Sequence, residues 1–224
     1  MFKDSKVIIT GVSSFLGDML ARAFLRQDAH VIGVDKSDSG LETEKYHFVK
    51  HDFVNDDSLE SICDAAREYF NETLDILVNV LPMRESSEIQ SVTGREFKEY
   101  FMESLYASID MNRKMYPMLL RSEQGNPSVI NIGSANSRKN TIDSGLMCLC
   151  AQTVIGLTRM QAGYYDGVRC NSISPVKPQD LETCQDIINT VLFLCSKDAS
   201  FITGSDFLLD YGESAKNAAR LESK

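Results

Sequence analysis

Residues 7–17 read Val7-Ile8-Ile9-Thr10-Gly11-Val12-Ser13-Ser14-Phe15-Leu16-Gly17 and connect a short apolar run to an amphipathic segment through a turn that contains glycine. The β-branched run Val7 to Thr10 predicts a buried strand. From Phe15 to Arg26, apolar residues recur every three or four positions, which predicts a helix. The stretch is therefore predicted to be a strand–turn–helix unit.

The same alternation of short apolar runs and helical patterns continues along the chain. Several runs are hydrophobic at every position, as expected for parallel strands that helices cover on both faces. Alternating strands and helices with right-handed crossovers give a doubly wound sheet. The sequence thus predicts an α/β fold of three layers, with about seven parallel strands flanked by helices. Further strands are expected at 31–35, 47–49, 74–79, 128–132, 168–173 and 207–210, and further helices at 59–70, 97–120, 146–162 and 184–195.

The length and charge of the chain limit its organisation and its partners. A chain of 224 residues suffices for one α/β domain, and we expect it over residues 1–212, with a polar C-terminal tail at 213–224. The net charge of −9 argues against nucleic acid or an anionic membrane as a partner, since both require clustered Lys and Arg. No run approaches the ~20 apolar residues of a membrane span, and the first residues lack the apolar stretch of a signal peptide. We expect a cytoplasmic protein.

The cysteines do not form the pattern of a metal site. None lies in a Cys-x-x-Cys pair, and no suitably spaced histidine accompanies them. Most lie in apolar runs, so we expect buried free thiols and no bound metal. The six are Cys63, Cys148, Cys150, Cys170, Cys184 and Cys195.

Several motifs in a specific order resemble those of the short-chain dehydrogenase/reductase family. Gly167 to Pro175 is similar to the family's Gly-Ile-Arg-Val-Asn-x-Ile-x-Pro. Residues 156–159 match its Gly-Leu-Thr-Arg, and residues 193–196, 202–204 and 209–212 are similar to its C-terminal motifs. The resemblance covers nearly the whole chain. It implies a Rossmann-like domain and, as the activity of the family, NAD(P)-dependent oxidation or reduction.

The resemblance also implies a cofactor site at the turn after the first strand. The family's Thr-Gly-x-x-x-Gly-x-Gly lets the cofactor pyrophosphate approach N–H groups at a helix N-terminus. Gly11 and Gly17 match this motif, and Ser13 and Leu16 belong to the same turn. Phe15 replaces the middle glycine, and its side chain is expected to intrude on the phosphates unless it rotates away.

Other residues match positions that surround the cofactor in the family. Asp35 ends the second strand and matches the acid that binds the adenosine ribose, which implies NAD rather than NADP; otherwise it is a surface aspartate. Asp52 and Phe53 resemble the family's Asp-Val near the adenine. Asn79 survives from Asn-Asn-Ala-Gly or is a structural residue at a strand end. Pro175 begins the family's Pro-Gly turn at the nicotinamide, here followed by valine and a short lid.

The catalytic positions of the family carry residues that cannot perform its chemistry. Its Tyr-x-x-x-Lys pair falls on Met147 and Ala151, and its Asn falls on Ser104. In the family the Tyr transfers the proton, while the Lys lowers the Tyr pKa and holds the nicotinamide ribose. Ser134, at the catalytic Ser position, is the one member retained, and it is either catalytic or structural.

No shift of the alignment restores the pair. The sequence has no Tyr between positions 116 and 164 and no Lys between positions 139 and 177. Tyr164 and Tyr165 are expected beyond the end of the helix, too far along to point into the same pocket. The family's mechanism is therefore expected to be absent.

The helix at 146–162 is nearly uncharged from Leu146 to Leu157, which predicts burial on more than one face. The family packs this helix and the long helix before it against a symmetry mate. The resemblance therefore implies a homo-dimer or homo-tetramer through residues 97–120 and 146–162, and an active paralogue is a further possible partner.

Three functions follow from these observations. In the first, which we favour, the chain is a pseudoenzyme that acts as a binding or scaffolding subunit. In the second, it is an NAD(P)-dependent oxidoreductase with an atypical proton donor, such as Ser134 or an ordered water. In the third, it is a nucleotide-sensing module that keeps only the adenosine half-site through Asp35 and Asp52.

Overall fold

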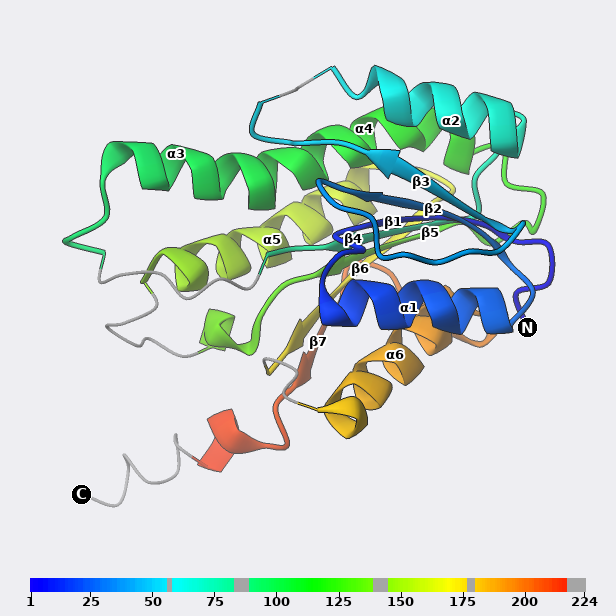
Figure 1. Cartoon of the computed structure of the whole chain (residues 1–224). Coiled ribbons are helices and arrows are strands. Elements are labelled where there is room, and N and C mark those ends of the chain that lie inside the picture. Colours follow the sequence, from blue (N-terminus) through cyan, green and yellow to red (C-terminus); the bar gives the residue numbers. More distant parts are fainter. Residues whose placement is uncertain (56–57, 83–88, 139–144, 177–179, 217–224) are drawn as a thin grey trace.

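The computed structural model describes residues 1–55, 58–82, 89–138, 145–176 and 180–216. Within these residues, seven parallel strands form one sheet in the order β3-β2-β1-β4-β5-β6-β7 (Figure 1). The order reverses between β1 and β4, as in a doubly wound sheet. The predicted fold class is confirmed. The strands are β1 (Lys6–Thr10), β2 (His30–Asp35), β3 (Tyr46–Lys50), β4 (Ile76–Val80), β5 (Ser128–Ile132), β6 (Arg169–Pro175) and β7 (Asp206–Leu209).

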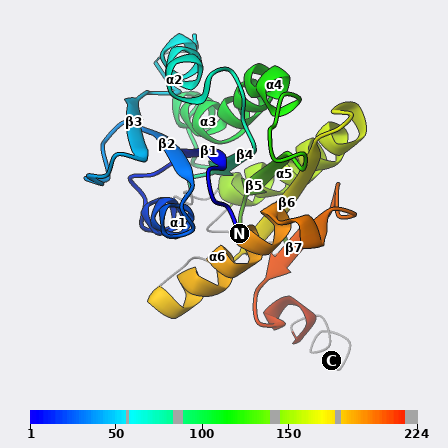
Figure 2. The same ribbon diagram turned by 90° about the vertical axis from the view of Figure 1, so that its right-hand side faces the viewer.

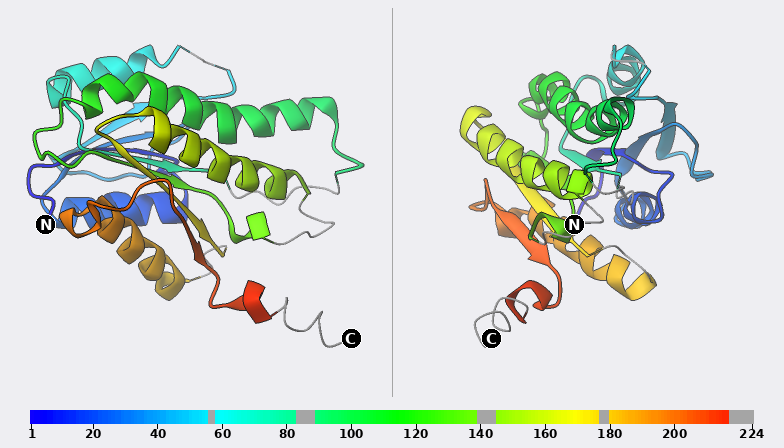
Figure 3. Two further views of the ribbon diagram at one scale, coloured as in Figure 1. Left: turned by 180° about the vertical axis from the view of Figure 1, so that it is seen from behind. Right: turned by 90° about the vertical axis from the view of Figure 1, so that its left-hand side faces the viewer.

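Helices cover both faces of the sheet, which gives three layers (Figures 1 and 2). On one face lie α1 (Phe15–Arg26) and α6 (Leu181–Cys195). On the other lie α2 (Glu60–Phe70), α3 (Gly94–Phe101), α4 (Ala107–Leu119) and α5 (Gly145–Tyr164). The views from the front and from behind show α3 and α5 extending side by side beyond the end of the sheet (Figure 3).

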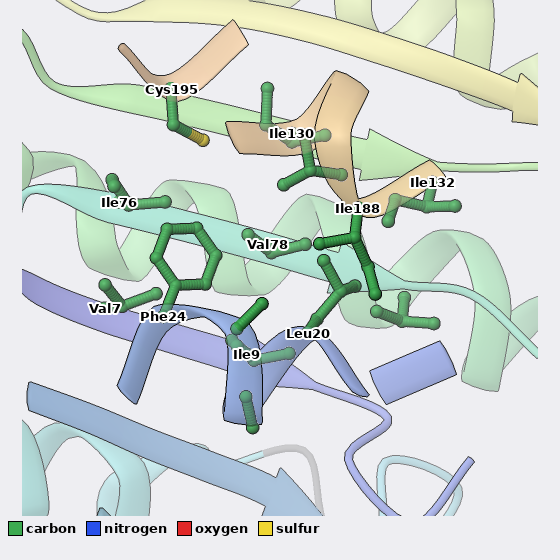
Figure 4. Close-up of a cluster of buried hydrophobic side chains, with 14 of the residues drawn as sticks. Val7, Ile9, Leu20, Phe24, Ile76, Val78, Ile130, Ile132, Ile188 and Cys195 are labelled. Atoms are coloured by element: carbon green, nitrogen blue, oxygen red, sulfur yellow. The ribbon is translucent and has the colours of Figure 1, made fainter. Parts of the chain in front are cut away.

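The core consists of a buried cluster on each face of the sheet. Figure 4 shows the cluster beneath α1 and α6, where Leu20 and Phe24 of α1 and Ile188 of α6 lie over strand residues such as Ile9 and Val78. All five side chains are fully buried. At ~1.5–3 kcal/mol for each large apolar side chain, this contact is the main term that holds α1 and α6 on the sheet.

The turn between β1 and α1 depends on two glycines. Gly11 has φ +75°, and a Cβ on it would lie 2.7 Å from the carbonyl oxygen of Val80 in β4. A Cβ on Gly17 would overlap the carbonyl oxygen of Gly11. Ser14 caps the helix, because its Oγ accepts a hydrogen bond from the Gly17 N–H at 3.1 Å. Helix α1 therefore starts in direct backbone contact with β1.

The expected long helix at 97–120 is wrong in one respect. It is interrupted by a π-helix, Met102–Tyr106, between α3 and α4. Side-chain hydroxyls bond back to carbonyls here: Ser104 Oγ donates to Tyr100 O at 2.5 Å, and Ser108 Oγ donates to Ser104 O at 3.0 Å. These bonds satisfy backbone groups in the irregular turn.

Smaller corrections concern where elements begin and end. Helix α2 starts at Glu60 because Leu59 has a positive φ of 49°. Helix α6 starts at Leu181 because the Asp180 side chain caps it by accepting from Thr183 N at 2.8 Å. Strand β6 runs on to Pro175, which pairs with Leu209 of β7.

One helical turn, residues 213–216, follows the last strand and makes up the described part of the polar tail predicted at 213–224. The Asp210 carboxylate anchors this turn by accepting hydrogen bonds from Gly212 N at 2.9 Å and Ser214 N at 2.8 Å. Residues 217–224 lie outside the described part of the chain.

All six cysteines are free, and all but the half-buried Cys63 are buried, which confirms the expectation from the sequence. Burial raises the pKa of the Cys170 and Cys195 thiols to about 12. These two thiols are therefore neutral at physiological pH. Among the helices described, none is long and apolar enough to cross a membrane.

Replacing Gly17 with alanine tests the backbone contact between α1 and β1. The Gly17→Ala variant should be less stable by about 1–3 kcal/mol or more, because the new methyl group overlaps a backbone carbonyl that cannot move aside. Gly163→Ala is the matched control, since a Cβ there meets nothing within 4 Å and alanine is favoured in a helix by ~0.5–1 kcal/mol. Urea unfolding of both variants measures the difference, and an unchanged Gly17→Ala midpoint would show that the contact is not required.

Candidate functional site

A cavity of about 510 Å³ opens where the strand order reverses, beyond the carboxyl ends of β1 and β4. This is the place at which open α/β sheets bind ligands. Its volume lies within the ~300–1,000 Å³ usual for small-molecule sites. The cavity is lined by Thr10, Gly11, Ser13, Ser14, Phe15, Leu16, Asp35, Lys36, His51, Phe53, Val80, Leu81, Pro82, Glu103, Ala107 and Ser108.

Phe15 is the first residue of α1 and one wall of this cavity. Its side chain causes no packing conflict within the fold, because the residue is half exposed. It therefore takes up space on the cavity side of the glycine turn. The neighbouring glycines, Gly11 and Gly17, are required by backbone contacts within the protein itself.

Asp35 fastens the end of β2 to the glycine turn. Its Oδ2 accepts hydrogen bonds from Ser13 N at 2.9 Å and from Ser13 Oγ at 2.6 Å. Its Oδ1 accepts from Lys36 N at 2.7 Å. The carboxylate that the sequence assigns to a ribose is thus already bonded to the turn.

Lys36 lies between two further carboxylates at the rim of the cavity. Its Nζ is 2.7 Å from Glu103 Oε1 in the π-helix and 3.1 Å from Asp52 Oδ1 after β3. Burial opposes ionisation of Asp52, but hydrogen bonds from Asn55 and from Val54 N–H, together with Lys36, lower its pKa below the usual value. This rim therefore carries an ammonium group shared by two carboxylates.

The positions of the catalytic pair lie in the hydrophobic interior. Met147 is buried in a cluster with Tyr100, Leu146 and Cys150, and its sulfur is 3.8 Å from Asn136 Nδ2. Ala151, one turn further along α5, is 4% exposed. Neither residue lines the cavity.

The two serines at catalytic positions are bonded to nearby backbone. Ser134 is buried after β5, and its Oγ accepts from Asn136 N at 3.2 Å. Ser104 is buried in the π-helix and donates to Tyr100 O. Ser104 also holds the Cys150 thiol: burial raises the pKa of that thiol, and a hydrogen bond with Ser104 partly opposes the shift.

Asn79 belongs to a buried network of amide side chains that the sequence did not indicate. Its Nδ2 donates to Asn112 Oδ1 at 2.8 Å and to Asn131 Oδ1 at 2.9 Å. Asn112 Nδ2 donates onward to Gln161 Oε1 at 2.9 Å, and Asn131 Nδ2 to Thr158 Oγ1 at 3.0 Å. The network joins β4 and β5 to α4 and α5, so Asn79 has a structural partner on each side.

The residues that the sequence singled out fall into two groups. Those that line the cavity are Gly11, Ser13, Phe15, Leu16, Asp35 and Phe53. Those that lie elsewhere are Gly17, Asp52, Asn79, Ser104, Ser134, Met147, Ala151 and Pro175. The half of the site assigned to adenosine and the turn is thus largely brought together, whereas the catalytic half is not.

Three charged or titratable lining residues were missed from the sequence. Lys36 and His51 each adjoin a residue that had been singled out, so their position next to Asp35 and Asp52 was an available signal. Glu103 likewise adjoins Ser104, but Ser104 does not line the cavity, and the orientation of Glu103 toward it depends on the π-helix.

The prediction that Tyr164 lies beyond the end of the helix at 146–162 is wrong. Helix α5 continues to Tyr164, two residues past the expected end, so Tyr164 lies within the helix. Its side chain is 78% exposed. The ring of Tyr165 stacks on Tyr116 of α4, with centroids 4.4 Å apart. Neither tyrosine lines the cavity.

Among the described residues, no group of three His, Cys, Asp or Glu side chains is placed to hold a metal ion. The polar side chains that line the described cavity are those of Thr10, Ser13, Ser14, Asp35, Lys36, His51, Glu103 and Ser108.

Comparison with known proteins identifies similar chains over most of this length. Residues 11–180 match the family described as enoyl-(acyl carrier protein) reductase. A curated relative, the short chain dehydrogenase adrF of Penicillium roqueforti, is 25% identical over 181 residues, which cover 78% of this chain and 70% of that protein.

Solved structures show the same fold. The ligand-free aldohexose dehydrogenase of Thermoplasma acidophilum superimposes with a TM-score of 0.84 at 24% identity, covering 96% of this chain and 95% of that one. The 3-ketoacyl-(acyl-carrier-protein) reductase of Brucella melitensis, complexed with NADH, gives a TM-score of 0.86 at 21% identity, covering 96% and 100%.

The buried amide network predicts a stability effect. Asn112→Ala should destabilise the protein by roughly 2–4 kcal/mol, because it leaves one N–H of Asn79 without its acceptor, removes one of the two donors to Gln161 Oε1, and opens a small cavity. Asn189→Ala on the exposed side of α6 is the control and should change the stability by less than ~0.5 kcal/mol. Thermal unfolding followed by circular dichroism measures both, and equal midpoints would contradict the structural role of the network.

Proposed function

The chain belongs to the short-chain dehydrogenase/reductase family, and we propose that it is a member which has lost the family's oxidoreductase activity and serves as a binding or scaffolding subunit. The observation that carries this proposal is the state of positions 147 and 151. Met147 has no transferable proton and Ala151 has no charge, and both are packed in the interior away from the cavity.

The chemistry lost at these positions is large. General acid–base catalysis contributes about 10²–10⁴ in rate. A tyrosine without a nearby cation titrates near pH 10, so restoring only one member of the pair would not restore the function of both. Ser134 does not compensate, because its buried Oγ accepts a backbone hydrogen bond and an aliphatic hydroxyl is a poor acid.

The described residues do not fit a complete dinucleotide. Phe15 stands on the cavity side of the turn that would hold a pyrophosphate, and Asp35 already bonds the Ser13 N–H of that turn. On the nicotinamide side, Pro175 of β6 is paired with Leu209 of β7 and does not line the cavity. Any dinucleotide bound would be NAD, because the Asp35 carboxylate repels a 2′-phosphate.

A second candidate function is a nucleotide-sensing module, and the cavity favours it. The cavity retains Asp35 and Phe53 on the adenosine side, although the catalytic positions lie outside it. A site that keeps the adenosine-side residues but not the catalytic positions is consistent with binding without catalysis. The NADH complex of the Brucella melitensis reductase shows that a protein of this fold binds a nucleotide.

We further propose self-association through α4 and α5. Apolar side chains stay exposed on both segments: Tyr106 at the end of the π-helix, Ile109 in α4, and Leu149, Met160 and Tyr164 on α5. In α5 they recur at the spacing of one helix face, and an exposed apolar stripe of this kind is typical of an interface.

Loss of activity is tested by following nicotinamide absorbance with a panel of alcohols, aldehydes and ketones. The native chain should give no turnover above the uncatalysed rate, whereas an active relative assayed beside it should. The triple variant Phe15→Gly, Met147→Tyr, Ala151→Lys tests whether these three positions account for the loss, and measurable activity or cofactor binding in it would support that account. Turnover by the native chain that Ser134→Ala abolishes would instead support the oxidoreductase with an atypical donor.

Self-association is tested by light scattering after size exclusion. The native chain should have at least twice the mass of one chain, and Leu149→Glu combined with Met160→Glu should return it to one chain, because two charges are buried unpaired in the interface. Tyr69→Glu, at an exposed position on α2, is the control and should leave the mass unchanged. A native monomer would refute the interface.

A further inference from the structure

We propose that the cavity binds an uncharged aromatic compound that carries hydroxyl donors, such as a nucleoside, and excludes ligands that carry a diphosphate. The proposal rests on the proposed function, in which this site binds a ligand without transforming it. The glycine turn suggests a dinucleotide as the ligand. Three features of the cavity favour an uncharged ligand instead: its charge, the hydrogen bonds that the amides of the turn already make, and its apolar wall.

The charge of the cavity disfavours an anionic ligand. Lys36 is the only cation among the described residues that line it. Its ammonium group is already shared by Glu103 at 2.7 Å and Asp52 at 3.1 Å. The Asp35 carboxylate adds a further negative charge beside the glycine turn. A diphosphate would therefore meet carboxylates with no unshared cation among the described lining residues to offset the repulsion.

Several N–H groups of the turn are engaged within the protein, although those of Phe15 and Leu16 are not among them. Ser13 N donates to Asp35, Ser14 N donates to Gly11 O at 3.1 Å, and Gly17 N donates to Ser14 Oγ. A carboxylate of the chain thus occupies an amide that could otherwise bind a phosphate oxygen. A diphosphate could bind here only if the Asp35 carboxylate moved away from Ser13 N or if the two anions lay close together.

The remaining wall is suited to an aromatic ring. Phe15 is half exposed although it lines a cavity, so a flat ligand can bury its ring without displacing any residue of the core. Apolar side chains continue the wall from Phe15 to the end of β4 and the start of α4. They are Leu16, Phe53, Val80, Leu81, Pro82 and Ala107.

Acceptors for hydroxyl groups lie at one end of this wall. Within the described part of the chain, Asp35 Oδ1 accepts one hydrogen bond, from Lys36 N. A carboxylate oxygen can accept two. A ligand hydroxyl at this oxygen would make a charge-assisted hydrogen bond without adding charge to the cavity. An aromatic body and a hydroxylated end together describe a nucleoside.

Calorimetric titration with adenosine, AMP, ADP and NADH tests the proposal, because the first three differ only in phosphate. Adenosine should bind most tightly, and the affinity should fall at least ~10-fold from adenosine to ADP, which corresponds to ~1.4 kcal/mol. Equal affinities, a preference for ADP or NADH, or no binding of any of the four compounds overturns it.

Variants of the rim separate a charge effect from general damage. Glu103→Gln removes one carboxylate from Lys36 and should raise the affinity for ADP several-fold with little change for adenosine. Glu99→Gln is the matched control, because Glu99 lies one turn earlier, pairs with Arg95 at 2.7 Å and does not line the cavity. If Glu99→Gln and Glu103→Gln change ADP binding equally, the charge of the cavity is not the cause.

Phe15→Gly tests the aromatic wall. It should weaken adenosine binding by about 10-fold, because the ring contact is lost, and should improve the access of ADP to the turn. Unchanged adenosine binding would refute the role of Phe15. These measurements are independent of turnover: a catalytically inert chain that binds none of the four compounds refutes only this inference, whereas turnover with a nicotinamide cofactor refutes the proposed function.

Discussion

The fold depends on a backbone contact at the turn between β1 and α1. Gly17 lies against the carbonyl of Gly11, and Gly11 lies against the carbonyl of Val80, so the turn, the first helix and β4 meet with no side chain between them. This contact fixes the start of α1 at the point where the strand order reverses. The cavity forms between the same elements, and its walls are therefore set by the packing of the fold before any ligand is considered.

The same contact explains which parts of the family's motifs survive. Gly11 and Gly17 are required by the chain's own backbone, whereas the middle position of the turn faces the cavity and accepts Phe15. The kept motif around Arg169 is likewise structural, because its guanidinium donates to Leu194 O at 2.7 Å at the end of α6. Positions 147 and 151 carry buried apolar side chains that contribute to packing. The motif residues that are kept are therefore those that stabilise the fold.

Hydrophobic runs were enough to predict the layers, because a strand buried on both faces leaves a continuous apolar signal, and α1 and β1 were found to within a residue. Features that depend on three-dimensional partners were not predictable in this way. No residue type in Met102–Tyr106 distinguishes a π-helix from an α-helix. The orientation of Glu103 could therefore not be predicted from the sequence. The amide network of Asn79 joins positions up to 52 residues apart, and polar residues in apolar runs do not reveal their partners.

The strengths of the contacts at the cavity decide how it can respond to a ligand. Lys36 is 46% exposed, and exposed ion pairs contribute only ~0–1 kcal/mol, so its pairs with Glu103 and Asp52 can be rearranged at small cost. Ser13 donates two charge-assisted hydrogen bonds to Asp35, from its N–H and from its hydroxyl, and they fasten the turn after β1 to the end of β2, so displacing this carboxylate breaks both at once. A ligand that leaves Asp35 in place and moves only the rim is therefore favoured over one that must displace this carboxylate from the turn. In the proposed site, the carboxylate that the sequence assigns to a ribose thus also repels a second anion.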